Sequence, residues 1–83
     1  MSLDELQQLE ADATRIYDLR LRDQLETSHP HAFVEIEPES GDYFLGKTLS
    51  EAMGAAHIAH PTLRAFCLRV GHSCAIQIGG HLA

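Results

Sequence analysis

The 83-residue sequence predicts a single α+β domain in which elements follow the order α-β-β-α-β-β. The four strands are expected to form a small antiparallel sheet, with the helices packed on one face. Two segments repeat apolar residues at steps of three and four, which is the spacing of one helix face. Two others alternate apolar and polar residues around a turn that contains glycine, as hairpins do. A proline follows each helical segment and ends it.

The first helix is expected over residues 1–28. Ser2 and Glu5 have the spacing of a capping box, in which each side chain accepts from the other residue's backbone N–H. The apolar stripe of this helix consists of Leu3, Leu6, Leu9, Ala13, Ile16, Tyr17 and Leu21. About 25 helical residues extend roughly 37 Å, whereas a compact chain of this size has a radius of gyration of about 12–13 Å. Part of the helix is therefore expected to reach beyond the domain.

A hairpin is expected over residues 32–46, in the stretch FVEIEPESGDYFLG that follows Ala32. Its first strand alternates, so Val34 and Ile36 are expected to face the core, and Glu35 and Glu37 to face solvent. The residues ESGD between the strands have turn composition, because glycine takes a positive φ at no steric cost. The acidic residues of this stretch are therefore interpreted as strand and turn residues.

A second helix is expected over residues 48–60. Thr48 and Glu51 form another capping-box pattern, and Pro61 ends the helix. A second hairpin follows over residues 64–79, with its strands in RAFCLRV and CAIQIG. One face of the third strand carries Phe66, Leu68 and Val70. The inward face of the fourth strand carries Cys74, Ile76 and Ile78.

The charge of the chain is unevenly distributed. Residues 1–42 hold eleven of the twelve acidic residues and three of the six basic ones, a net charge of −8, and the remainder carries +2. This acidity argues against nucleic acid as a partner, because phosphate contacts need Lys and Arg, and against anionic membrane surfaces. No apolar run approaches the roughly 18 residues of a membrane span. The N-terminus is acidic where a signal peptide is basic, so a cytoplasmic protein is expected.

Part of the sequence resembles a family of short uncharacterised bacterial proteins. The matching stretches are IYDLRLRDQLE, FVEIEPESGDYFLG, TLSEA, HP and CLRVG, and the resemblance covers roughly residues 13–79. It implies a fold and brings no activity. The chain departs from the family pattern at His60, where an aromatic residue is usual, and in GAAHIAH, where the family has a more charged helix face. Both departures lie on or beside the second helix, which suggests a new interface there.

Catalytic chemistry is the least expected of the function classes. The four carboxylates of the first hairpin are the residue type that hydrolases use in pairs. However, Glu35 and Glu37 are expected on the solvent face of a strand, where Arg69 is available as a partner across the sheet. Cys67 is expected to face away from the core, with no acid–base partner near it that would activate a thiol.

Six histidines in 83 residues raise an alternative, a small metal-binding protein. His57 and His60 are three residues apart, so on a helix they share a face and would share an ion. His72 and Cys74 would add ligands from the following turn. Imidazole and thiolate suit Zn²⁺, Ni²⁺ or Cu. No Cys-x-x-Cys or His-Glu-x-x-His spacing is present, which weakens the metal-binding alternative. No Gly-x-Gly-x-x-Gly or phosphate loop is present either, so no cofactor other than these metals is expected.

The second helix supplies the first functional hypothesis. Its inward stripe is Leu49, Ala52, Met53, Ala56 and His60. Its opposite side carries Glu51, Gly54, Ala55 and Ile58. One acid among small and apolar residues is a weak solvent face and a suitable surface for close helix packing. The sequence therefore predicts a non-catalytic protein–protein interaction module that forms a homo-oligomer, most simply a dimer, or binds another protein through this side.

Overall fold

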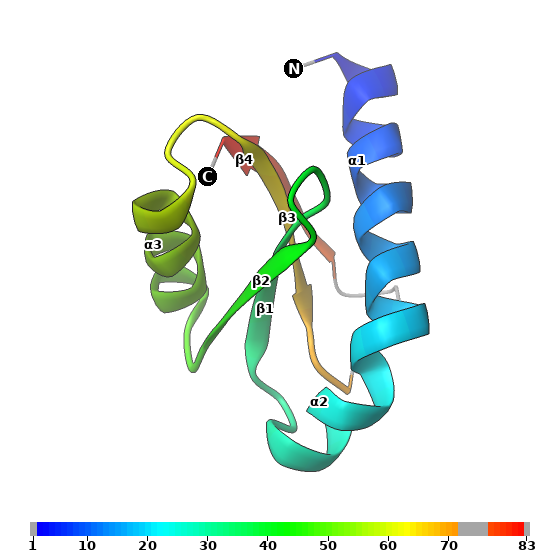
Figure 1. The fold of residues 1–83 in the computed structure, drawn as a ribbon, viewed down its shortest axis with the longest axis vertical. Helices are drawn as coiled ribbons and strands as arrows, with labels where there is room; N and C mark the ends of the chain where they lie inside the picture. Colours follow the sequence, from blue (N-terminus) through cyan, green and yellow to red (C-terminus); the bar gives the residue numbers. More distant parts are fainter. Residues whose placement is uncertain (1, 72–76, 83) are drawn as a thin grey trace.

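Two helices lie on either side of an antiparallel sheet (Figure 1). The structure is a computed structural model that describes residues 2–71 and the backbone of residues 77–82. The first helix consists of α1 (Leu3–Ile16), a π-helical turn η1 (Tyr17–Leu21) and α2 (Arg22–Ser28). The other elements are β1 (Phe33–Glu37), β2 (Asp42–Gly46), α3 (Leu49–Ala59), β3 (Arg64–Arg69) and β4 (Gln77–Leu82).

The α+β class agrees with the sequence, but the predicted packing of both helices on one face of the sheet is wrong, because α1 and α3 lie on opposite faces. The strand order is β2-β1-β3-β4, and side chains are described for β2, β1 and β3. The backbone of β4 runs antiparallel beside β3. It begins at Gln77, whereas the predicted strand over residues 74–79 begins outside the described residues.

The helices cover opposite faces because both faces of the two inner strands are buried (Figure 1). Along β3, Phe66 and Leu68 belong to the core beneath α1. Ala65, on the other face, packs with Ala56 of α3. A strand that is apolar on both faces needs a layer on each side. The predicted one-sided arrangement took the second face to be solvated.

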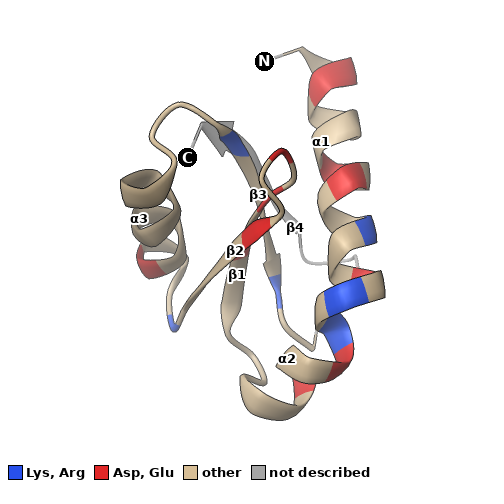
Figure 2. Ribbon diagram, in the orientation of Figure 1, with Lys and Arg blue, Asp and Glu red and all other residues tan. Residues whose placement is uncertain are grey.

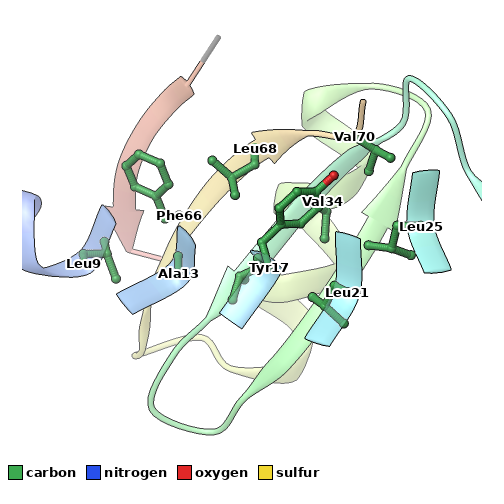
Figure 3. Close-up of a cluster of buried hydrophobic side chains, with 10 residues drawn as sticks. Leu9, Ala13, Tyr17, Leu21, Leu25, Val34, Phe66, Leu68 and Val70 are labelled. Atoms are coloured by element: carbon green, nitrogen blue, oxygen red, sulfur yellow. The ribbon is translucent and has the colours of Figure 1, made fainter. Parts of the chain in front are cut away.

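The larger core lies between α1–α2 and the sheet, and Figure 3 shows side chains from both sides meeting there. Its helical residues are Leu9, Ala13, Tyr17, Leu21 and Leu25, which recur every four residues. A strict four-residue step drifts by about 40° per repeat around an ideal α-helix. The π-helical turn, in which the N–H of Arg22 donates to the carbonyl of Tyr17, corrects part of this drift and keeps the stripe on the sheet.

The first turn of α1 extends past the core. Leu3 is 68% exposed, whereas Leu9 is buried. The capping box forms as the sequence predicts, since the N–H of Glu5 donates to Ser2 Oγ and the N–H of Ser2 donates to Glu5 Oε1. Within the described part of the chain, no helix is both long and apolar enough to cross a membrane.

Candidate functional site

The outer side of α3 faces away from the sheet and carries the four residues predicted as an interface. Ile58 is 84% exposed, and Gly54 and Glu51 are also exposed. Ala55 is half-buried at the edge of this surface. A Cβ added at Gly54 would meet no atom within 4 Å, so the helix surface is open there. We call the surface formed by Glu51, Gly54, Ala55 and Ile58 the α3 outer face.

The N-terminus of α3 is held firmly against the hairpin. Thr48 Oγ1 accepts from the N–H of Glu51 at 3.2 Å. The Glu51 carboxylate accepts from the N–H of Lys47 at 3.0 Å, one residue earlier than a capping box would place it. A Cβ at Gly46 would lie 2.5 Å from the backbone nitrogen of Ala52, so only glycine allows β2 and α3 to approach this closely.

The C-terminus of α3 is tied to the same hairpin through a contact that the sequence did not indicate. His60 Nε2 lies 2.7 Å from Asp42 Oδ2, at the start of β2. The His60 ring also meets Phe44 edge-on, with 6.0 Å between ring centroids. With both ends of α3 anchored on β2, the outer face is presented by a fixed helix.

Two of the four predicted metal ligands, His57 and His60, lie among the described residues. His60 caps α3 with non-helical backbone angles, and its ring is turned toward Asp42. His57 is exposed on the last turn of the helix. His72 and Cys74 lie outside the described residues. Among the residues that are described, no three His, Cys, Asp or Glu side chains form a group that would hold a metal ion. A metal site that includes His72 and Cys74 stays a prediction.

Glu35 and Cys67 occupy the sheet face beneath α3, directly opposite each other on β1 and β3. Both are fully buried, so the prediction of Glu35 as a solvent-facing strand residue is wrong. The alternation of β1 is present, but α3 covers the face that the sequence assigned to water. Burial raises the pKa of Glu35 to about 7. Burial, together with the nearby Glu35 carboxyl, raises the pKa of the Cys67 thiol to about 12, so this thiol is not an activated nucleophile.

Glu37 is also buried, contrary to prediction, and its role is to order the hairpin turn. Its carboxylate accepts from the backbone N–H of Glu39 at 2.6 Å and of Ser40 at 2.7 Å. Gly41 follows with φ of 81°, the left-handed conformation expected for the turn. The carboxylate thus satisfies two N–H groups that a tight turn would otherwise leave unpaired.

Arg69 does not pair with either glutamate. The strand register places it opposite Phe33, and Cys67 is the residue opposite Glu35. Its guanidinium stacks over the Phe33 ring, 5.3 Å from the centroid, and its Nε donates to the carbonyl of His31 at 3.2 Å. Pairing on a strand depends on register, which alternation alone does not give.

A groove of about 570 Å³ lies on the other side of the sheet, between α1 and the turn after β1. Its apolar lining is supplied by Leu9, Ile16 and Pro38. Its charged lining is supplied by Glu5, Asp12, Arg15, Glu37, Glu39 and Arg64, and Gln8 is also part of the wall. Sequence reasoning missed this groove, because its walls are distant in the chain and only the fold brings them together.

Comparisons of the chain with known protein families, with curated proteins and with solved structures find no match. The chain has two candidate binding surfaces, the α3 outer face and the groove beside α1. Neither contains a nucleophile beside a general base, or a triad of metal ligands, among the described residues.

Proposed function

We propose that the chain is a non-catalytic protein–protein interaction module that associates with a second copy of itself through the α3 outer face. The observation that carries this proposal is the 84% exposure of Ile58 on a helix whose opposite side is packed on the sheet. Burying a fully exposed Ile contributes roughly 1.5–3 kcal/mol, and a two-fold contact counts it once per copy.

The composition of the face favours another helix as its partner. Gly54 and Ala55 have small side chains or none, so beside Ile58 the backbones of two helices can approach closely. The single acidic side chain, Glu51, is already engaged with the N–H of Lys47. Two copies of α3 can therefore meet without burying an unpaired charge, which would cost several kcal/mol.

The charge distribution selects this side of the molecule for self-association. Residues 1–42 carry −8 and residues 43–83 carry +2, so contacts between two α1 sides would be repelled. Figure 2 shows acidic and basic positions along α1 and α2, while α3 is almost free of them. The α3 side is thus where two copies approach with the least electrostatic cost.

The test is the oligomeric state of Ile58→Glu, measured by sedimentation velocity together with circular dichroism. We expect the parent chain to be a dimer and Ile58→Glu to be a folded monomer, because the substitution places like charges in the contact. Leu19→Glu is the matched control, since Leu19 is 78% exposed on the first helix and lies outside the face.

Three results would refute the proposal. The first is a parent chain that is monomeric at high micromolar concentration. The second is dissociation by Leu19→Glu to the same extent as by Ile58→Glu, which would indicate charge alone as the cause. The third is unfolding of Ile58→Glu, which would show that Ile58 stabilises the fold of the single chain.

A further inference from the structure

The groove beside α1 is lined by apolar residues and by more acidic than basic side chains. Its volume of about 570 Å³ lies within the range of sites that enclose a small molecule or a few side chains. Leu9 and Ile16 approach from the helix, and Pro38 approaches from the hairpin turn. Apolar surface of this kind recognises aliphatic carbon, either a hydrophobic residue or the stem of a long cationic side chain.

The two basic residues of the groove are already paired with its acids. Arg64 forms an ion pair with Glu5, which ties the start of β3 to the first turns of α1. The Arg64 hydrogen bond lowers the pKa of Glu5 to about 2, with smaller contributions from Ser2, so Glu5 is ionised. Arg15 lies 3.4 Å from Asp12. These two pairs leave the local charge balanced on the helix side.

The hairpin side of the groove is not balanced. The buried Glu37 carboxylate accepts from the backbone N–H groups of Glu39 and Ser40, whereas Glu39 itself is exposed. Among residues 2–71, neither carboxylate forms an ion pair. The groove therefore offers one exposed carboxylate of the turn, that of Glu39, next to the apolar surface of Leu9 and Pro38, within the half of the chain that carries −8.

We propose that this groove binds a segment of a partner protein in which an arginine or lysine lies next to an apolar residue. The cation would meet the exposed carboxylate of Glu39, and the apolar side chain would lie against Leu9, Ile16 and Pro38. An acidic segment or a nucleic acid would be repelled by the acidic residues that line the groove. The site is separate from the α3 outer face, since α1 and α3 cover opposite faces of the sheet (Figure 1), so each copy of a dimer would present one groove.

The test uses a fluorescein-labelled peptide that alternates arginine and leucine, with binding followed by fluorescence anisotropy at physiological ionic strength. A second peptide with glutamine in place of arginine measures the contribution of the positive charge. Free spermidine, used as a competitor, measures how much of the binding needs the apolar side chains. We expect the arginine peptide to bind at least about tenfold more tightly than the glutamine peptide, a difference of about 1.4 kcal/mol. Spermidine should compete poorly, because it lacks the apolar side chains.

Two pairs of variants locate the binding. Glu39→Lys should weaken binding about tenfold or more, whereas Asp23→Lys makes the same change of charge on α2, outside the groove, and should leave affinity within about twofold. Gln8→Trp should fill the groove without changing its charge and should also weaken binding. Gln24→Trp, an exposed position on α2, is its control.

The proposal is wrong if the arginine peptide does not bind, or if Gln8→Trp binds it as the parent chain does. Equal losses in Glu39→Lys and Asp23→Lys would indicate general attraction to an acidic protein. Spermidine binding as tight as that of the peptide would assign the groove to a small polycation instead. A folded Ile58→Glu monomer that still binds the peptide would show that the groove functions independently of self-association.

Discussion

The two faces of the sheet are packed in contrasting ways. Under α1 and α2, large aliphatic and aromatic side chains from the helix and the strands meet with no charged group among them (Figure 3). Under α3, the helix contributes only alanines to the buried layer, and the sheet contributes Glu35 and Cys67. The first face resembles the core of an ordinary small domain. The second places an ionisable carboxyl under a thin layer of small residues.

This contrast separates what stabilises the fold from what is available for function. Burial of apolar area supplies most of the folding free energy, so the α1 face carries most of the stability. The α3 layer buries little, and its helix is held mainly by its caps and by contacts with β2. It therefore keeps an apolar residue, Ile58, on its outer side that the fold itself does not use.

The largest expected effect is the loss of a ring from the α1 face. Phe66 is 2% exposed in the main core, and Phe66→Ala should reduce the free energy of unfolding by about 3–5 kcal/mol, through lost burial and a cavity. A chain of this size has roughly 4–12 kcal/mol in total, so the variant should be close to unfolded. Urea denaturation followed by circular dichroism measures the change.

Phe44→Ala is the matched variant on the α3 face, where the ring is half-buried against Ala56 and Ala65. It should cost clearly less than Phe66→Ala, on the order of 1–2 kcal/mol. Equal losses at the two positions would contradict the view that the α1 face dominates stability.

The second prediction concerns the pH dependence that Glu35 gives to the α3 face. Burial raises its folded pKa from 4.5 to about 7, so the folded state holds a proton that the unfolded state releases between these values. The free energy of unfolding should therefore fall as pH rises from 4.5 to 7 and stay constant above, by about 3 kcal/mol from this residue.

Glu35→Gln isolates this contribution, because glutamine resembles the protonated carboxyl at every pH. Relative to the parent chain, the variant should be of similar stability near pH 4 and more stable by up to about 3 kcal/mol near pH 8. Glu26→Gln, which removes an exposed carboxylate on α2, is the control for the loss of a negative charge alone. A stability difference between Glu35→Gln and the parent chain that does not vary with pH would contradict the prediction.

Local signals in the sequence were sufficient to place the helices and the first hairpin. The caps at Ser2 and Thr48 mark the starts of α1 and α3, and β1 follows the alternation around Val34. Each signal depends on residues within a few positions of one another, which is the range that sequence patterns report. The strict four-residue spacing from Leu9 to Leu25 is also a signal of the π-helical turn, because an α-helix alone would not keep that spacing on one face. An α-helical stripe was the simpler interpretation.

These local signals do not show which face of the sheet each helix covers. Alternation in β1 indicates that Glu35 and Glu37 share a face, but whether that face is solvated depends on where α3 packs. The side that α3 covers is a tertiary property, as are the Asp42–His60 contact and the groove beside α1. The residues that share the outer side of α3 could be predicted, because the residues that lie on one face of a helix follow from their spacing in the sequence.

The smallest expected effect is at Gly54, which differs from Gly46 in its distance from the packed layer. At Gly46 an added Cβ would lie 2.5 Å from the nitrogen of Ala52, so Gly46→Ala should push α3 away from β2 and cost about 1–3 kcal/mol. At Gly54 nothing lies within 4 Å, and alanine favours a helix over glycine by about 1 kcal/mol. Gly54→Ala should therefore raise the melting temperature of the chain, while Gly46→Ala lowers it.

Thermal denaturation of both variants in an Ile58→Glu background removes any contribution from association. If Gly46→Ala is as stable as its parent there, α3 does not depend on close contact with β2, and the α3 face is looser than its anchoring contacts indicate.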